Sequence, residues 1–391
     1  MPRVLFFHTS SILGGSEKAF LDLITQYPKQ DADDAFFILP SHGPLEKRLI
    51  EIFGRSDRIT VIEWPSKFNK ASRKFPIRSL FWTMLSLLDL VKYFFKIQRF
   101  ITDQKIQVIY SNGIKCHIIT GVLKRFSKVK VIWHLQDFFP HISFVDLFLK
   151  FIARQPDLII ANSKSVLDDF QKHAPSSWAP ASQVIHNSVN PLEFLPSEKP
   201  IQKPIVVSLV AMLTPWKGQD IFIEAMSIVR SQLSAGEIQG WIVGEEVYKT
   251  AGEQGYAEHL RNLISKKSLS DTVTMKGLIA DVQAVYNSSD IVVHCSVKPE
   301  PFGRVIVEAM SCERAVIASR AGGVLEIIES EKDGLLVEPG RPEELAKAIL
   351  RLVSDASLRK RLGTAARLTV IRKFNSAQFA ENIMSEIQAL Q

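Results

Sequence analysis

Short apolar runs alternate with amphipathic stretches along the whole chain, and this alternation breaks off once and then starts again. Before the break, the runs predict strands at Val4–His8, Phe36–Leu39, Ile59–Ile62, Val108–Ser111, Val129–His134 and Leu158–Ala161. After it, they predict strands at Ile205–Val210, Trp241–Gly244, Val273–Met275, Ile291–His294, Ala315–Ala318 and Gly334–Val337. Continuous apolar runs suit strands covered on both faces, and strands that alternate with helices favour a parallel sheet. The sequence therefore predicts an α/β protein with two doubly wound parallel-sheet domains.

The break is a proline-rich segment over residues 187–204. Its prolines are Pro191, Pro196, Pro200 and Pro204. Because proline is excluded from helix interiors and central strands, we interpret the segment as an interdomain linker. The expected division is an N-terminal domain over 1–188, a linker over 189–204 and a C-terminal domain over 205–376. Ligands bind at the carboxyl ends of parallel strands, so we expect a cleft site there, although this architecture does not select the ligand.

Composition narrows the class of protein further. Hydrophobic residues make up 46% and charged residues 23%, which is typical of a globular chain. Cys116, Cys295 and Cys312 lie far apart, which excludes a disulfide framework and favours a reducing, cytoplasmic compartment. The net charge of +7 suits anionic lipids, nucleotides or nucleic acid. We expect no nucleic-acid partner, because the basic residues are not interleaved with a stacking platform.

Much of the basic excess lies in residues 67–100. The segment Lys67–Arg78 precedes the apolar stretch Leu80–Ile101, whose uncharged part is too short to span a bilayer. Two interpretations stay open. The segment is either a solvated loop before a core helix, or a surface that contacts anionic lipid headgroups or a lipid-diphosphate acceptor. The second would place the protein peripherally on the inner face of the membrane, with help from Phe68, Phe75, Phe81 and Trp82.

The strongest chemical signal is the stretch EPFGRVIVE, from Glu300 to Glu308. It follows a predicted strand as a polar loop that leads into a helix. Gly303 would let the backbone pass close to a ligand, and the N–H groups at the helix start can bind a phosphate. Carboxylates accept hydrogen bonds from sugar hydroxyls, so one glutamate could hold a hexose and the other a ribose. On spacing alone, solvated charges at a helix end are an equally good interpretation.

The pattern EPFGRVIVEAM followed by AGGVLE resembles the GT-B glycosyltransferases of family 4, which are retaining nucleotide-sugar transferases. Further matches run in order over nearly the whole chain. They are Gly14 to Glu17, Trp133 to Asp137, Ala161 to Ser163, Ile185 to Val189, Pro215 to Gly218 and Asp333 to Val337. The resemblance implies two Rossmann-like domains that face a cleft, and a C-terminal helix over 377–391 that crosses back to the first domain.

The resemblance also implies site residues. Those implied to bind the donor are Gly14, Gly15, Lys217, Gly277, Leu278, Ile279, Phe302, Gly303, Arg304 and Glu308. Those implied to act in catalysis are His134, Lys217 and Glu300. Lys217 would contact the donor diphosphate, Glu308 the ribose and Glu300 the transferred sugar. The segment 277–279 would frame the nucleobase, and His134 would lie near the sugar and the acceptor.

One position departs from the family pattern. The family usually carries an arginine five residues before its lysine, where this chain has Met212. A diphosphate would then meet one cation fewer, and Arg304 is the candidate replacement. No metal site is expected, because no DxD motif occurs at a plausible strand end.

The resemblance therefore predicts a retaining, metal-independent hexosyltransferase. It would move a sugar from a nucleoside-diphosphate sugar, which is a substrate rather than a cofactor, to the hydroxyl of a sugar, lipid-linked or small-molecule acceptor. Synthesis of cell-surface polysaccharide, glycolipid or a related glycan is the expected context. The alternative is a non-catalytic nucleotide-sugar-binding partner subunit of the same fold. A dinucleotide-dependent oxidoreductase is disfavoured, since Gly14-Gly15 is not part of a GxGxxG pattern.

Overall fold

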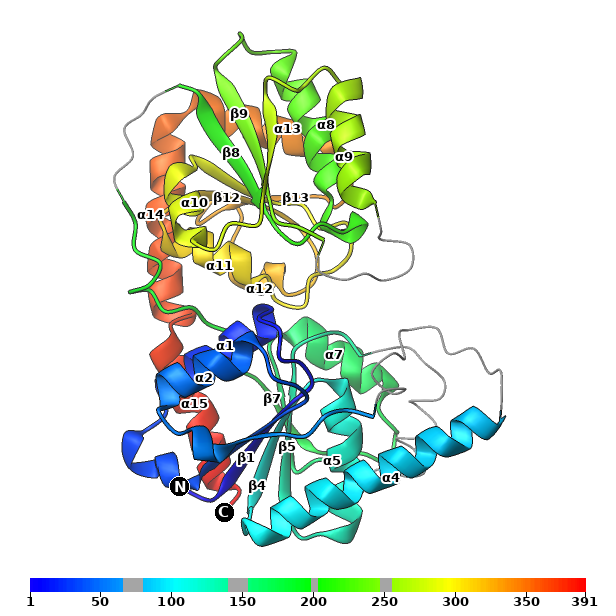
Figure 1. Ribbon diagram of the computed structural model, residues 1–391. Helices are drawn as coiled ribbons and strands as arrows, with labels where there is room; N and C mark the ends of the chain where they lie inside the picture. Colours follow the sequence, from blue (N-terminus) through cyan, green and yellow to red (C-terminus); the bar gives the residue numbers. More distant parts are fainter. Residues whose placement is uncertain (66–79, 140–153, 198–202, 247–254) are drawn as a thin grey trace. The chain divides into compact units, whose positions relative to one another are not determined.

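The computed structural model describes residues 1–65, 80–139, 154–197, 203–246 and 255–391, which divide into two units (Figure 1). The first unit comprises Met1–Asn187 and Ser376–Gln391, and the second comprises Ser188–Asn375. The basic segment Lys67–Arg78, with Phe68 and Phe75, lies outside the described residues, as do the side chains of Phe81 and Trp82.

The first unit is built on a parallel sheet of seven strands in the order β3-β2-β1-β4-β5-β6-β7. The strands are β1 Val4–His8, β2 Ala35–Leu39, β3 Ile59–Val61, β4 Val108–Asn112, β5 Lys130–Leu135, β6 Leu158–Ala161 and β7 Ala181–Val184. The edge strand β7 was not predicted. Its sequence, ASQV, has no apolar run because none of its residues is buried.

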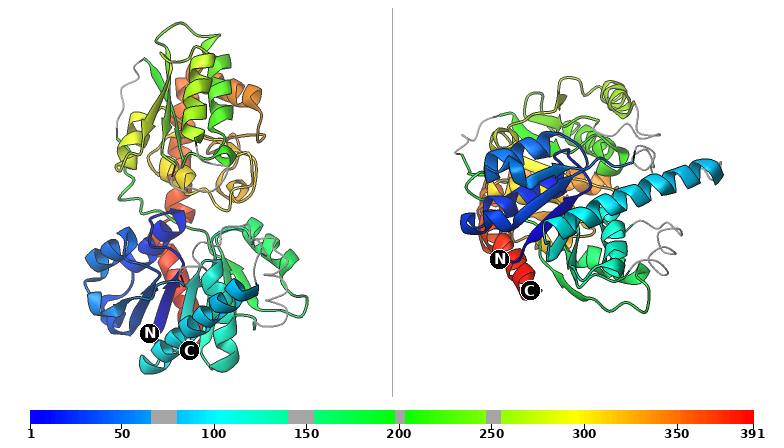
Figure 2. Two further views of the ribbon diagram at one scale, coloured as in Figure 1. Left: turned by 45° about the vertical axis from the view of Figure 1, so that its right-hand side comes forward. Right: turned by 60° about the horizontal axis from the view of Figure 1, so that its bottom comes forward.

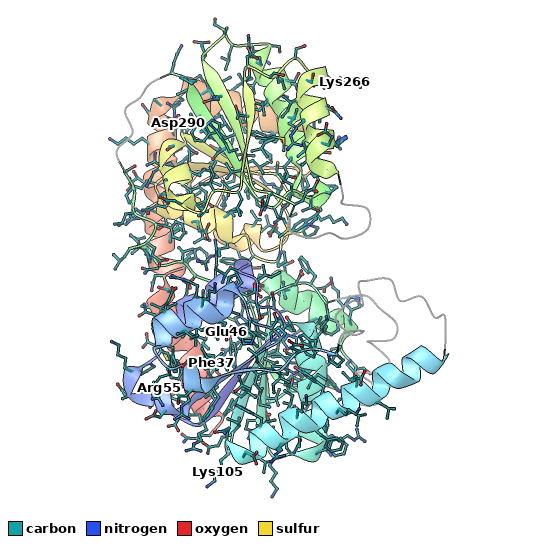
Figure 3. All side chains as sticks on the ribbon, in the orientation of Figure 1. Phe37, Glu46, Arg55, Lys105, Lys266 and Asp290 are labelled. Carbon is teal, nitrogen blue, oxygen red and sulfur yellow. The ribbon has the colours of Figure 1, made fainter. Side chains whose placement is uncertain are left out.

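Helices cover both faces of this sheet. They are α1 Gly15–Thr25, α2 Pro44–Phe53, α4 Leu80–Asp103, α5 Ile114–Phe126, α7 Lys164–His173 and α15 Ser376–Ala389, with short 3-10 turns at Lys29–Asp34 and Ser56–Arg58. One core contains residues of α1, α2 and α15, and the other contains residues of α4, α5 and α7. Phe37, labelled in Figure 3, stacks on Phe6 in the first of these cores at 5.4 Å between ring centroids.

The second unit repeats this plan with a six-stranded parallel sheet in the order β10-β9-β8-β11-β12-β13. Its strands are β8 Ile205–Val210, β9 Ile238–Val243, β10 Val273–Gly277, β11 Ile291–His294, β12 Ala315–Ser319 and β13 Leu335–Val337. Its helices are α8 Gln219–Arg230, α9 Tyr256–Lys266, α10 Val282–Ser288, α11 Arg304–Ser311, α12 Val324–Ile327, α13 Pro342–Ser354 and α14 Ala356–Lys373, with a 3-10 turn at Pro215–Lys217. One core contains residues of α8, α9 and α13, the other contains residues of α10, α11 and α12, and α14 contributes to both.

The prediction of two doubly wound parallel-sheet domains with a returning C-terminal helix is confirmed. Within the second unit, the proline-rich segment packs more closely than a free linker would. Val189 is fully buried and pairs with Asn375, and the Phe194 carbonyl accepts hydrogen bonds from Ser311 at 3.0 Å and Arg367 at 3.1 Å. The buried Val189 side chain, the half-buried Phe194 ring and the Phe194 carbonyl therefore tie residues 188–197 to this unit.

Strand order places the candidate site. In the second unit the chain runs from β8 outward to β9 and β10, and then returns to the other side of β8 to form β11. The loops after β8 and β11 therefore diverge from two adjacent strands, which is where doubly wound sheets bind ligands. In the first unit the corresponding point lies between β1 and β4.

Among the residues that the structure describes, no helix has both the length and the hydropathy needed to cross a membrane.

Candidate functional site

Lys217 and Glu300 lie on the two loops that leave β8 and β11, and they form a bidentate ion pair. Lys217 Nζ donates to Glu300 Oε1 at 2.9 Å and to Oε2 at 2.7 Å, and each side chain is only 12% exposed. The Lys217 ammonium also lies 3.9 Å from the centroid of the Trp216 ring. Gly218 fixes this turn, because its φ is +72° and a Cβ there would lie 2.1 Å from the Cys295 carbonyl oxygen.

Glu300 Oε2 has two further donors. His294 Nε2 lies 3.1 Å from it and the Ser296 hydroxyl lies 3.0 Å from it. Burial opposes ionisation of Glu300, but the charge of Lys217 and the hydrogen bond from His294 outweigh it and hold the carboxyl pKa far below its usual range. Glu300 is therefore a carboxylate at neutral pH.

The backbone of Glu300 is held by the AGG turn after β12. Gly322 forms a parallel bridge with Glu300, and the Gly323 N–H donates to the Glu300 carbonyl at 2.8 Å. A Cβ at Gly322 would lie 2.3 Å from that carbonyl oxygen, and one at Gly323 would lie 2.3 Å from the Pro301 carbonyl oxygen. Two glycines are required because the two loops touch through their backbones.

A second ion pair lies at the start of α11. Arg304 Nε donates to Glu308 Oε1 at 2.9 Å, and Arg304 Nη1 donates to the Ser188 carbonyl at 2.8 Å. The Tyr286 hydroxyl donates to Glu308 Oε2 at 2.9 Å. The side chains of Arg304 and Glu308 are 10% and 3% exposed. A cation in the first turn of a helix meets the positive end of the helix dipole, and here the Glu308 carboxylate compensates it.

The two ion pairs are neighbours. Gly303, the N-cap of α11, has φ +107°, and a Cβ on it would lie 3.7 Å from Glu300 Cγ. The loop after β11 and the start of α11 therefore carry two ion pairs, each nearly buried, on either side of Gly303. Removing any one charged side chain would leave its partner charge without compensation, which is costly in a buried setting.

Other predicted donor residues of this unit lie apart from the pairs. The Phe302 side chain is buried and packs edge-on to Phe374 at 5.8 Å, so only its backbone can face a ligand. Gly277, with φ +69°, ends β10, and Leu278 after it is 66% exposed, whereas Ile279 is half-buried. The segment 277–279 thus follows the edge strand, separated from β8 by β9.

The remaining predicted residues belong to the first unit. Gly14 caps α1, which begins at Gly15, and the Gly14 N–H donates to the Glu17 carboxylate at 3.0 Å. His134 lies near the end of β5 with 1% exposure, and its Nδ1 is hydrogen-bonded to the Tyr110 hydroxyl. Burial lowers the pKa of His134 to about 3, so its imidazole is neutral at physiological pH.

His134 belongs to a polar row across the sheet. His8, Asn112 and His134 are register neighbours on β1, β4 and β5, and all three are buried. Next to this row, Gln136 and Asn187 exchange side-chain hydrogen bonds at 2.7 Å and 3.2 Å. The motifs WHLQD and HNS therefore meet at the carboxyl edge of this sheet.

Sequence reasoning missed three side chains that hold the carboxylates: Tyr286, His294 and Ser296. The signal for two of them was available, because polar side chains at positions 294 and 296 alternate at a strand end just before Glu300. Tyr286 gave no signal, since it lies on the separate helix α10. At the departing position, the Met212 carbonyl accepts a hydrogen bond from Gln219 at 2.8 Å. The described residues contain no group of three His, Cys, Asp or Glu side chains that could hold a metal.

Two family models match the chain one after the other. The model described as Glycosyltransferase Family 4 matches residues 13–192, and the model described as Glycosyl transferases group 1 matches residues 193–369. The chain belongs to this family of GT-B glycosyltransferases. The resemblance to family 4 that the sequence motifs indicated is thereby confirmed.

The chain is also similar in sequence to individual glycosyltransferases. The chain is 28% identical over 216 residues to an uncharacterized glycosyltransferase of Methanocaldococcus jannaschii, MJ1178, with 55% of each chain covered. It is 23% identical over 421 residues to the human alpha-1,3/1,6-mannosyltransferase ALG2, covering 100% of this chain and 96% of that one. It spans about half the length of several curated glycosyltransferase relatives that it matches.

Among solved structures, Anabaena Alr3699/HepE in complex with UDP and glucose has a TM-score of 0.80 with this chain at 26% identity, covering 99% of this chain and 100% of that one. The same protein in complex with UDP-glucose gives a TM-score of 0.78 at 25% identity, with 99% of each chain covered.

Proposed function

We propose that this GT-B protein transfers a sugar from a nucleoside-diphosphate sugar to an acceptor hydroxyl. The observation that carries the proposal is the presence of two nearly buried ion pairs, Lys217–Glu300 and Arg304–Glu308, on the loop after β11 and the helix start that follows it, at the switch point of the second sheet. Structures of Anabaena HepE contain UDP with glucose, and UDP-glucose, which supports a nucleotide sugar as the donor.

Each ion pair supplies one part of what a nucleotide sugar needs. When a diphosphate enters, Lys217 and Arg304 can donate to its oxygens instead of to their carboxylates. The released carboxylates then accept hydrogen bonds from hydroxyl groups, with Glu300 serving the transferred sugar and Glu308 the ribose. No charge stays buried without a partner, before or after binding. This exchange also gives Arg304 the task of the arginine that Met212 replaces.

The same groups would lower the barrier to transfer. Cleavage of the anomeric bond leaves negative charge on the departing diphosphate, which Lys217, Arg304 and the helix start at Gly303 would stabilise. In this scheme Glu300 accepts hydrogen bonds from hydroxyl groups of the transferred sugar and does not attack the anomeric carbon. We infer a front-face reaction with retention. The acceptor oxygen bonds to the anomeric carbon on the side from which the diphosphate leaves, and its proton passes to a departing phosphate oxygen.

The cations in the site make a metal unnecessary in this scheme, because Lys217 and Arg304 take the place that a divalent ion would have beside the diphosphate. We therefore expect the transfer rate to be the same with EDTA as with added Mg²⁺. Loss of turnover in EDTA, restored by Mg²⁺, would overturn the metal-independent form of the proposal.

A thermal-shift panel with UDP, GDP, ADP and CDP tests the donor site. Ligand at about 100 times its Kd stabilises the native state by about 2.7 kcal/mol, so one nucleoside diphosphate should clearly raise the Tm. Glu308→Gln should weaken that shift, because it replaces the charged ribose acceptor with a weaker neutral one. Failure of all four to bind would refute the donor assignment. Binding without transfer to any glycan or lipid acceptor, and without slow hydrolysis of the donor, would favour a non-catalytic partner subunit.

The exposed face of α4, in the first unit, supports glycan or glycolipid synthesis near a membrane surface. On α4, Leu88, Val91 and Phe95 are 52%, 43% and 63% exposed and repeat at helical spacing, opposite the buried stripe of the same helix. Lys92 and Lys96 are exposed beside them. The first turns of α4 extend past α5 and α7 (Figures 1 and 2). Apolar side chains flanked by lysines suit the interface of an anionic bilayer.

This membrane contact is tested by sedimentation with vesicles. Vesicles containing phosphatidylglycerol should retain the protein, and pure phosphatidylcholine vesicles should not. Phe95→Ser should reduce retention, whereas Leu192→Ser, which changes a 77% exposed leucine of the second unit, should not. Equal binding by both variants and the parent would remove α4 from the membrane surface.

A further inference from the structure

Two side chains that the transfer scheme does not use converge on Glu300. His294 is the last residue of β11, and Ser296 lies two positions further on, in the loop that leaves the strand, where its side chain is buried. The two side chains are 3.1 Å apart, and both reach the same oxygen, Glu300 Oε2. Both residues are at least 95% buried. Two buried donors on one oxygen fix the orientation of the Glu300 carboxylate.

The two oxygens of Glu300 are bound unequally. Oε2 accepts hydrogen bonds from Lys217, His294 and Ser296, whereas Oε1 accepts one from Lys217. His294 Nδ1 has no hydrogen-bond partner among the described residues, so a single ring proton is best placed on Nε2, where it meets acceptors. When Lys217 turns away, Oε2 keeps two donors and Oε1 becomes a free acceptor.

We propose that His294 and Ser296 are positioning residues that hold Glu300 in place while Lys217 moves from its carboxylate to the donor diphosphate, so that Oε1 stays aimed at the transferred sugar. The inference rests on the proposed donor site. It assigns different roles to the residues around Glu300. Lys217 binds the diphosphate, and His294 and Ser296 fix the position from which Glu300 contacts the sugar. Without His294 and Ser296, the released Glu300 carboxylate would be free to rotate. Ordering it would then cost free energy when the sugar binds, and the affinity for the sugar would fall.

The consequence is a selective loss. Removing the His294 or Ser296 side chain should weaken binding of the transferred sugar. It should not weaken binding of the nucleoside diphosphate, which carries no transferred sugar for Glu300 Oε1 to contact. The quantity to measure is therefore the sugar increment, defined as the Kd of UDP divided by the Kd of UDP-glucose. Isothermal titration gives both values for each variant. GDP and GDP-mannose replace this pair if the thermal-shift panel selects GDP.

Ser296→Ala and His294→Leu should each lower the sugar increment about tenfold, since a hydrogen bond to a charged group contributes about that much or more. The Kd of UDP should change less than about twofold, within about 0.4 kcal/mol. Ser296→Thr and His294→Gln keep a donor and should recover most of the increment and of kcat. Ser311→Ala is the matched control, because it deletes an equally buried hydroxyl of the same unit that binds the Phe194 carbonyl.

The outcomes separate the inference from the donor assignment. An unchanged sugar increment in Ser296→Ala and His294→Leu, with UDP and UDP-glucose bound normally, overturns the positioning role and leaves the proposed function standing. Equal weakening of UDP and UDP-glucose also overturns it, because the pair would then act on the diphosphate or on the fold. If a deletion variant does not fold, Ser296→Thr and His294→Gln decide by whether their increments match the parent. Absence of any nucleotide binding by the parent refutes the proposed function itself.

Discussion

Replacing Lys217 by Met is the sharpest test of how the empty site is held together. Methionine keeps most of the apolar stem of lysine and deletes the ammonium, so the change isolates the charge. Lys217 Nζ makes two contacts with Glu300, at 2.7 and 2.9 Å, with each side chain 12% exposed. The variant therefore leaves a nearly buried carboxylate with only His294 and Ser296 as donors.

The cost follows from that burial. Breaking a buried ion pair by removing one partner destabilises a protein by about 3–5 kcal/mol, against less than about 1 kcal/mol for an exposed pair. The second unit, Ser188–Asn375, is in the size range where 1 kcal/mol moves the Tm by about 2–4 °C. We therefore expect the unfolding transition of this unit to move down by roughly 6–20 °C at neutral pH.

The pH dependence identifies the cause. In the parent, the pKa of Glu300 lies below its ordinary value of 4.5, so its contribution to stability is present above 4.5 and is lost as pH falls toward the lowered pKa. Burial is the largest single influence on this carboxyl and raises its pKa, so deleting Lys217 moves the pKa upward. A raised pKa gives stability that is lost as pH rises through it. The Tm difference between parent and Lys217→Met should thus be larger at pH 8 than at pH 5.

Differential scanning calorimetry at pH 5 and pH 8 measures both effects. Glu300→Gln in the Lys217→Met background removes the stranded carboxylate, and should recover part of the lost Tm at pH 8 and abolish the pH dependence of the difference. A Tm within about 2 °C of the parent at pH 8, corresponding to about 1 kcal/mol or less, would show that the pair is solvated and that the reasoning from burial is wrong.

Three further predictions follow from local geometry. Gly322→Ala and Gly340→Ala both place a side chain at positive φ, +67° and +69°, but only the first also places a Cβ against the Glu300 backbone. Chemical denaturation should therefore show a loss of unfolding free energy about 1–3 kcal/mol larger for Gly322→Ala, and equal losses would contradict the contact. His8, His134 and His117, which is a buried residue of α5, have pKa values lowered to about 3. The free energy of unfolding of the first unit should therefore fall below about pH 6.5 by up to about 1.4 kcal/mol per pH unit for each histidine, and His117→Phe should remove one of the three contributions; a flat profile would contradict their neutrality. Arg304→Ala should weaken UDP binding at least about tenfold by titration calorimetry, as expected for loss of a charge-assisted hydrogen bond, and an unchanged Kd would remove Arg304 from the site.

The strands and the family were predictable because the information is local. Buried parallel strands are apolar runs, and the runs around Val4–His8 and Ile205–Val210 have the bounds that the structure gives. The edge strand Ala181–Val184 was missed because it is not buried, and hydrophobicity carries no signal there. The packing of Val189 and Phe194 against the second unit was missed for the opposite reason, since the prolines around them suggested a free linker.

The candidate site was predictable as a set of residues but not as a set of partnerships. The motif around Glu300 and Glu308 could be located, yet Lys217 is 83 positions away from Glu300, and their pairing depends on β8 and β11 being adjacent. Arg304 and Glu308 are four residues apart on one helix, so their pairing could be predicted. Their burial could not, because it depends on contacts with Tyr286 of α10 and with Ser188. Long-range strand order and burial are the quantities that a single sequence does not carry.

Those partnerships change what the site can select. A site with free cations would bind any diphosphate, and the tightest ligand would be the smallest and most highly charged one. Here Lys217 and Arg304 are already neutralised by Glu300 and Glu308, so an anion must displace two carboxylates. Inorganic pyrophosphate takes the cations and offers no hydroxyl, which leaves both nearly buried carboxylates without a compensating cation or a ligand donor. A nucleoside diphosphate compensates one of them with its ribose, and a nucleotide sugar compensates both. Affinity should therefore rise from pyrophosphate to nucleoside diphosphate to nucleotide sugar, although net negative charge falls along that series, and Glu300→Gln should flatten its last step.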